Sequence, residues 1–177
     1  MTGLTASRAY GILALRVVTG FYFLWAGLDK VLSFIGGTEP FSAYGFLTFA
    51  TGGTTSAVVA EGTIVNPTQP FWVDLAANTA LLGAIDILVP YGQIAIGLAL
   101  ILGVATRFAG VMGFLMMSFI TIASWDFAHG LVNATSFLAL SSLVLGVIRA
   151  GEVYGIDAIV DEQPIVQRTP VLRYVLG

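Results

Sequence analysis

Residues 9–30 read AYGILALRVVTGFYFLWAGLDK, and this stretch decides what kind of fold the chain adopts. Its length suits a membrane-spanning helix, because crossing the hydrocarbon core takes about 20 mostly apolar residues. At helical spacing, one stripe of this helix holds the polar and small residues Arg16, Gly20, Phe23, Gly27 and Lys30. An arginine inside a spanning helix costs about 2.5 to 3.5 kcal/mol, and glycines let a neighbouring backbone approach closely. We therefore predict that this stripe faces protein; the alternative is that Arg16 lies near the interface and extends its charge to water.

The composition of the whole chain is that of an integral membrane protein. Of 177 residues, 57% are hydrophobic and 10% are charged, and the mean hydropathy is +0.92. The seven basic residues form no tract that would bind nucleic acid. Cysteine is absent and His129 is the single histidine. We therefore expect no intrinsic haem, iron–sulfur cluster or metal site.

The hydrophobic pattern predicts an all-α, four-helix transmembrane bundle in a single membrane domain, 1–177. The spans are expected at about 9–30, 84–104, 108–125 and 131–148. Residues 33–83 are expected to form a long extracytoplasmic lid with short interfacial helices, and 150–177 a cytoplasmic tail that docks or lies at the interface.

Residues 71–89 are ambiguous, because the segment is apolar but carries Asp74, Asn78 and Asp86. Either it is an interfacial helix that ends at Pro90, or it continues through Pro90 into the second span. The glycine and polar residues keep a helical period across the proline, which favours a continuous kinked helix.

Basic residues near the ends of the predicted spans indicate the orientation of the chain. Those expected on one side of the bilayer are Arg8, Arg107, Arg149, Arg168 and Arg173. Because cytoplasmic loops carry the excess of Lys and Arg, we expect a multi-pass protein of the cell membrane with both termini in the cytoplasm.

The order and spacing of three segments resemble the DoxX/DoxD family of small four-helix membrane proteins. The segments are LRVVTGFYFLWAGLDK at 15–30, YGQIAIGLALILGVATRFAG at 91–110 and GEVYGIDAIV at 151–160. The resemblance assigns the family pattern to Arg16, Gly20, Gly27, Lys30, Gly97, Gly103, Arg107, Gly155 and Asp157. The long lid is similar to the DoxD branch, the membrane subunit of thiosulfate:quinone oxidoreductase, and other members are linked to terminal quinol oxidases. The resemblance thus implies a quinone and respiratory partner subunits.

Polar residues near the ends of the third and fourth spans suggest a quinone site. Asp126 and His129 are the candidate proton and hydrogen-bond partners of a quinone head, whose carbonyls accept hydrogen bonds and take up protons on reduction. The other candidate contacts to the quinone are Arg16, Lys30, Gln93, Trp125 and Asn133.

Several of these residues also have a structural interpretation. Arg16 and Asp86 are predicted to form a pair that makes insertion tolerable. Asp126 would pair with Lys30, and His129 would cap the fourth helix.

Two classes of function follow from the sequence. The chain is either a membrane subunit of a quinone-linked oxidoreductase or a non-catalytic scaffold of a membrane complex. Its expected partners are the bilayer, other respiratory subunits and an extracytoplasmic protein on the lid, and a homo-oligomer is compatible with both classes. A small transporter has little support, since the sequence shows no internal inverted repeat.

Overall fold

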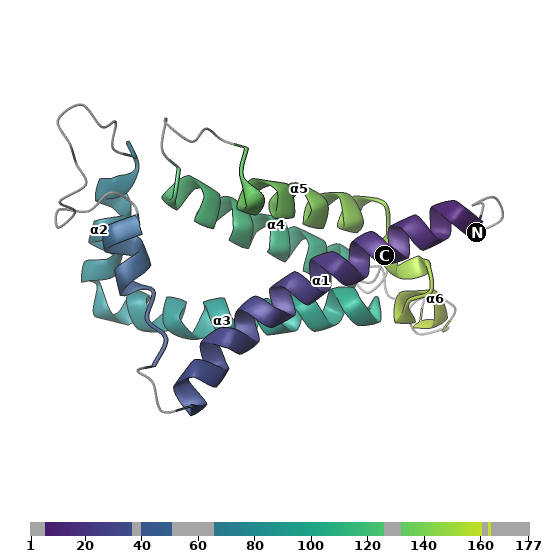
Figure 1. The fold of residues 1–177 in the computed structure, drawn as a ribbon, viewed down its shortest axis with the longest axis horizontal. Helices are drawn as coiled ribbons and strands as arrows, with labels where there is room; N and C mark the ends of the chain where they lie inside the picture. Colours follow the sequence, from purple (N-terminus) through teal and green to yellow (C-terminus); the bar gives the residue numbers. More distant parts are fainter. Residues whose placement is uncertain (1–5, 37–39, 51–65, 126–131, 161–162, 164–177) are drawn as a thin grey trace.

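The computed structural model describes residues 6–36, 40–50, 66–125, 132–160 and 163, and all regular elements in these ranges are helical (Figure 1). The elements are α1 (Ala6–Ile35), η1 (Phe46–Ala50), α2 (Gln69–Ala77), α3 (Thr79–Leu102), α4 (Thr106–Ala123), α5 (Ala134–Val147), η2 (Ala150–Glu152) and α6 (Ile156–Val160).

Three helices, α1, α3 and α4, are long and apolar enough to cross a membrane, which indicates a membrane location. The predicted span at 131–148 corresponds to α5, which is apolar but has only 14 residues. A straight helix of that length covers about 21 Å at 1.5 Å per residue, less than the roughly 30 Å hydrocarbon core. The structure therefore supports three of the four predicted spans by length and composition.

The glycines of α1 bring this helix against α3. A Cβ added at Gly20 would lie 2.9 Å from the carbonyl oxygen of Gly97, and one at Gly27 would lie 2.7 Å from that of Pro90. The two helices are therefore antiparallel and touch through their backbones. The opposite face of α1 exposes large apolar side chains such as Val18 and Trp25, as expected for a surface toward lipid.

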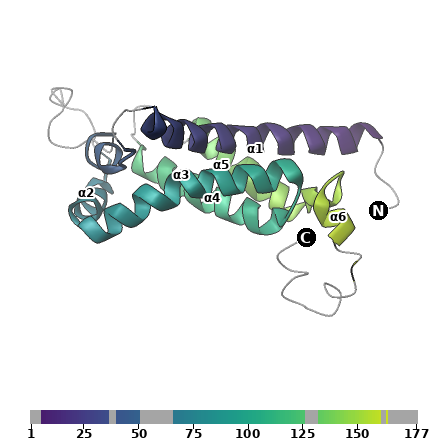
Figure 2. The same ribbon diagram turned by 90° about the horizontal axis from the view of Figure 1, so that it is seen from below.

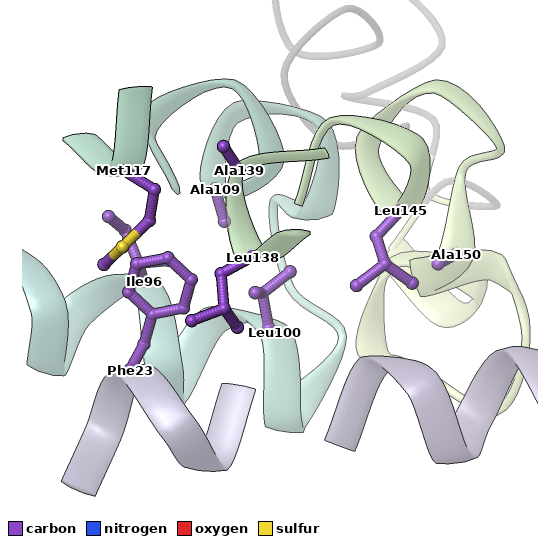
Figure 3. Packing of buried hydrophobic residues seen from close by; sticks show 9 residues of the cluster. All are labelled: Phe23, Ile96, Leu100, Ala109, Met117, Leu138, Ala139, Leu145 and Ala150. Carbon is purple, nitrogen blue, oxygen red and sulfur yellow. The ribbon is translucent and has the colours of Figure 1, made fainter. Parts of the chain in front are cut away.

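The core lies where α1 and α3 meet the α4–α5 pair (Figure 3). Phe23 from α1, Leu100 from α3 and Leu145 from α5 are completely buried. On the α4 side, a Cβ at Gly110 would lie 2.8 Å from the Cα of Gly146, so these two helices also pack at close range. Small residues at both contacts make the bundle tight.

The ambiguous segment 71–89 divides at Asn78. Helix α2 ends at Ala77, and the Asn78 side chain accepts hydrogen bonds from the backbone N–H groups of Ala80 and Leu81, which begins α3. Helix α3 then continues through Pro90 to Leu102. The favoured continuity across Pro90 is thus present, but only from Thr79 onward: residues 71–77 belong to a separate helix, and α3 starts five residues earlier than the predicted span at 84.

The bundle has two different ends. Helices α2 and η1 lie at one end, whereas α6 lies at the other, beside the first turns of α1 (Figures 1 and 2). Three of the basic residues predicted to share one side of the bilayer lie at the α6 end. Arg8 and Arg107 are in the first turns of α1 and α4, and Arg149 follows α5. Arg168 and Arg173 lie outside the described residues.

Candidate functional site

Arg16 is buried at the α6 end, where it binds backbone carbonyls that follow α5. Its Nη1 donates to the carbonyl oxygens of Ala150 at 2.7 Å and Val153 at 2.9 Å, and its Nη2 donates to that of Tyr154 at 3.2 Å. The residue is only 1% exposed. These carbonyls satisfy most of the guanidinium donors away from water, which removes the need to reach an interface.

Asp157 accepts hydrogen bonds from the turn between α3 and α4, whereas Arg16 donates them to the segment after α5. Its carboxylate accepts from the backbone N–H groups of Ala105 at 2.7 Å and Thr106 at 3.0 Å, and from the Thr106 hydroxyl at 2.7 Å. Its own N–H donates to the carbonyl of Gly103 at 2.8 Å. The carboxylate thus caps the first turn of α4, where orphan N–H groups favour a negative charge.

Glycines make this cluster compact. A Cβ on Gly103, which has a φ of +68°, would lie 2.7 Å from Nη1 of Arg16, and one on Gly155 would lie 2.8 Å from the same atom. We call Arg16, Gly103, Thr106, Gly155 and Asp157 the α6 junction. It leaves no room for a ligand beside the guanidinium, so its geometry is that of a structural joint.

The structure does not form the predicted Arg16–Asp86 pair. Arg16 lies at the level of Gly103, and Asp86 is about 25 Å away along α3 at 1.5 Å per residue. Asp86 instead accepts hydrogen bonds from the backbone N–H of Ala43 at 2.6 Å and from the hydroxyl of Ser42 at 3.2 Å. Backbone carbonyls, together with electrostatic attraction to Asp157, take the place expected for Asp86.

A cavity of about 640 Å³ lies at the other end of the bundle, among α1, α3, α4 and α2. Its size falls in the range of about 300 to 1,000 Å³ that is typical of small-molecule sites. The lining is almost entirely apolar and aromatic, and comprises Lys30, Phe41, Ala43, Phe46, Leu47, Phe71, Trp72, Leu75, Ile85, Val89, Gln93, Met116, Phe119, Ile120 and Ala123. We call this cavity the pocket.

Two polar side chains enter the pocket. Gln93 is 3% exposed, and its amide oxygen has no hydrogen-bond partner among the described residues. An unpaired buried polar group costs about 1 to 3 kcal/mol, so such a group points to a missing partner. Lys30 donates to the carbonyl oxygen of Ala26 at 2.9 Å, and its ammonium lies 5.6 Å from the centroid of the Phe41 ring. The wall of the pocket is therefore apolar except for the Lys30 ammonium and the Gln93 amide, whose oxygen has no hydrogen-bond partner among the described residues.

A second cavity of about 460 Å³ adjoins the pocket and shares Phe71, Trp72 and Phe119 with it. The indole N–H of Trp72 donates to the Thr68 hydroxyl at 2.8 Å, so this ring offers only carbon surface to either cavity. The second cavity is otherwise lined by Pro67, Thr68, Pro70 and Ile122, so its wall is mostly apolar.

The structure brings together two of the predicted quinone contacts, Lys30 and Gln93. Asn133 does not line the pocket: it caps α5 by accepting from the N–H of Ser136 at 3.0 Å and from the hydroxyl of Thr135 at 2.7 Å. Trp125 lies just beyond α4 and is not one of the lining residues. Arg16 belongs to the α6 junction, and Asp126 and His129 lie outside the described residues.

The resemblance-based residues also separate into two groups. Gly20, Gly27 and Gly97 form the close α1–α3 contact, whereas Gly103, Gly155 and Asp157 build the α6 junction with Arg16. Arg107 lies at the start of α4 next to Thr106. Within the described parts of the chain, no three His, Asp or Glu side chains gather as they would around a metal ion.

The aromatic wall of the pocket was not predicted. Trp72 and Phe119 approach with ring centroids 6.3 Å apart at 85°, and Trp72 is 6% exposed. In the sequence they read as ordinary apolar residues of an interfacial or spanning helix. They are distinguished only by the contact that brings Trp72 of α2 against Phe119 of α4.

The fold and the pocket together define a helical membrane protein with an apolar, ligand-sized cavity near one end. No family model, no curated protein and no solved structure matches the chain, so the protein is described by this class alone.

Proposed function

We propose that this chain is the membrane subunit of a quinone-linked oxidoreductase, and that the pocket holds the quinone head. The observation that carries the proposal is the buried, unpartnered amide oxygen of Gln93 in a cavity whose otherwise apolar wall also includes Lys30. A few precisely placed polar groups in an apolar wall are typical of cofactor sites.

The chemistry of both side chains suits the two redox forms of a quinone. An oxidised quinone presents two carbonyl acceptors, to which the Lys30 ammonium and the Gln93 amide NH₂ can donate. The reduced quinol presents hydroxyl donors, and the free Gln93 oxygen accepts from them. If a quinone were bound there, the Lys30 ammonium would offer a positive charge to a quinone oxygen, and a bound quinone would supply two-electron, two-proton redox chemistry.

The walls of the two cavities suit the rest of such a molecule. Phe41, Trp72 and Phe119 provide faces against which a flat ring can pack. In this proposal an apolar tail lies in the second cavity, which shares Phe71, Trp72 and Phe119 with the pocket.

The resemblance to the DoxX/DoxD family supports a quinone and a larger respiratory complex as the setting. Residues from all three resembling segments meet at the α6 junction. In this proposal α5 completes a four-span bundle, and the α6 end faces the cytoplasm because it carries Arg8, Arg107 and Arg149. The electron donor belongs to a partner subunit.

A non-catalytic scaffold subunit is the second candidate, favoured by the α6 junction, where strong polar groups serve packing alone. Such a subunit requires no ligand in the pocket. Quinone binding therefore discriminates between the two functions.

The test measures binding of menadione and decylubiquinone to the purified chain in lipid nanodiscs, by quenching of tryptophan fluorescence. We expect saturable binding that weakens about tenfold in Gln93→Leu, the equivalent of roughly 1.4 kcal/mol for a lost hydrogen bond. The matched control is Gln163→Leu, because Gln163 is exposed and does not line the pocket. No saturable binding would favour the scaffold, and equal binding by wild type and Gln93→Leu would overturn the assignment of the quinone head to Gln93.

A further inference from the structure

Two segments of the chain close the α2 end of the pocket, residues 41–50 and 66–77, which we call the cover. Its residues in the pocket wall are Phe41, Ala43, Phe46, Leu47, Phe71, Trp72 and Leu75. Leu47 is 4% exposed and Trp72 is 6% exposed, so the cover presses closely on the bundle. The strength of the contacts that hold the cover on the bundle therefore affects the rate at which a ligand enters and leaves the pocket.

Asp86 fastens the first segment of the cover to α3. Its carboxylate accepts from the N–H of Ala43 at 2.6 Å and from the hydroxyl of Ser42 at 3.2 Å. The carbonyl oxygen of Ala43 in turn accepts from the N–H of Leu47 at 2.9 Å, at the start of η1. A hydrogen bond to an ionised carboxylate is among the stronger ones, so this contact fixes where the segment begins its turn over the pocket.

Asn66 fastens the second segment to the end of α4. Its amide NH₂ donates to the carbonyl oxygens of Ile122 at 2.7 Å and Ala123 at 2.8 Å, which belong to the last turn of the helix and lack intrahelical partners. Asn66 is 5% exposed. Both donors of this amide are therefore used on the bundle.

The same asparagine orients the pocket wall through Thr68. Its amide oxygen accepts from the N–H and the hydroxyl of Thr68 at 2.8 and 2.7 Å, and the Thr68 oxygen accepts from the indole N–H of Trp72 at 2.8 Å. A continuous chain of hydrogen bonds thus leads from the end of α4 to the ring of Trp72. The cover's other contacts to the bundle include a long hydrogen bond from the Thr68 hydroxyl to the carbonyl of Ile122 at 3.5 Å, the cation–π contact of Lys30 with Phe41, and apolar packing, which is non-directional.

We infer that Asp86 and Asn66 are positioning residues of the pocket: two tethers that hold the cover on α3 and α4 and set the rate at which a ligand enters and leaves. The identity of the ligand rests on the proposed function, but the tethers do not. Neither side chain is a lining residue, so each acts through the residues that it holds.

A cysteine placed in the pocket reports on the cover without any ligand. Because the chain has no cysteine, Met116→Cys gives a single thiol in the pocket wall, and its rate of reaction with a water-soluble maleimide measures opening of the cover. We expect the rate to rise about tenfold when Asp86→Leu or Asn66→Ala is added, since each removes at least two hydrogen bonds. Asp86→Asn retains an acceptor oxygen, so it should restore most of the slow rate.

Matched controls separate the tethers from general loosening. Asn78→Ala also removes a side chain that accepts two backbone hydrogen bonds, but at the cap of α3, and Asp74→Leu removes an exposed carboxylate of α2. Both should leave the rate unchanged. A thiol at Val132, which is 91% exposed, provides the reference rate. Unchanged labelling in both Asp86→Leu and Asn66→Ala would overturn the inference.

A second measurement tells failure of the tethers from failure of the proposed function. The release rate of bound decylubiquinone should rise in the same two variants and return toward the wild-type value in Asp86→Asn. If labelling accelerates but no quinone binds, the tethers stand and the quinone proposal falls. If quinone binds but neither labelling nor release accelerates, the tethers fall and the pocket proposal stands.

Discussion

The two ends of the bundle use a cation of α1 in opposite ways. At the α6 junction, Arg16 donates to three backbone carbonyls, and the surrounding glycines leave no space for a Cβ. At the pocket, about 21 Å further along α1, Lys30 lies beside a cavity of about 640 Å³ and a Gln93 oxygen without a partner. Only Nε of Arg16 lacks a partner among the described residues, and the tight packing around this cluster stabilises the fold, whereas the unpaired Gln93 oxygen lines empty space that is available to a ligand.

The strongest way to break the α6 junction is Asp157→Leu. It removes a carboxylate that accepts three hydrogen bonds and attracts the buried Arg16 charge, which should destabilise the protein by about 3 to 5 kcal/mol. We expect a large loss of folded yield and of the midpoint of thermal unfolding in detergent. Asp74→Leu is the control, because Asp74 is exposed on α2. Equal stability of the two variants would refute a structural role for the junction.

An intermediate effect is expected where α1 touches α3. In Gly97→Ala the new Cβ would lie 2.7 Å from the carbonyl oxygen of Gly20, so the helices must separate, at a cost of about 1 to 3 kcal/mol. Gly83→Ala is the matched control in the same helix, because a Cβ there meets nothing within 4 Å. The measurement is the difference in thermal unfolding between the two variants. Comparable stability would mean that α1 and α3 do not pack as described.

The smallest effect on stability is expected at the pocket. Lys30→Met removes one hydrogen bond within α1 and a cation over Phe41, which together stabilise the fold by about 1 kcal/mol or less. Binding of menadione should nevertheless weaken several-fold, because the donor to a quinone carbonyl is lost. Thermal unfolding measures the change in stability, and fluorescence titration of the same sample measures the change in affinity for menadione. A variant that unfolds readily yet binds normally would reverse the contrast between the two ends.

Much of the fold follows from hydrophobic pattern alone. Long, mostly apolar runs identify α1, α3 and α4, and the spacing of Gly20 and Gly27 indicates the face through which α1 packs. The break at Asn78 was not predicted, because an N-cap asparagine inside an apolar segment resembles any other tolerated polar residue. The cap is decided by local hydrogen bonds to Ala80 and Leu81 that compete with continuing the helix.

The partners of Arg16 and Asp86 were predicted wrongly for a physical reason. Sequence reasoning pairs side-chain charges, but a guanidinium is satisfied equally well by carbonyls such as those of Ala150 and Val153. These carbonyls face Arg16 only because the chain turns back after α5. Hydropathy does not indicate which backbone carbonyls in such a turn are available to accept a hydrogen bond from a side chain.

The pocket was predicted in part. Lys30 and Gln93 stand out as polar residues in apolar helices, and the antiparallel α1–α3 contact brings them to one cavity. The position of Trp72 depends on the hydrogen-bond chain from Asn66 through Thr68, which crosses between distant segments. Residues held by such long-range contacts carry no local signal in a single sequence.

The most direct test of the account is photoaffinity labelling of the chain in nanodiscs with an azidoquinone, followed by mass spectrometry of the labelled peptides. We expect label in peptides from 85–93 and 116–123, reduced about tenfold by Gln93→Leu and unchanged by Gln163→Leu, because Gln93 is the open hydrogen-bonding group of the pocket. Label confined to 132–160, or label in the pocket peptides that Gln93→Leu leaves intact, would contradict the central claim that the two ends of this bundle divide structure from ligand binding.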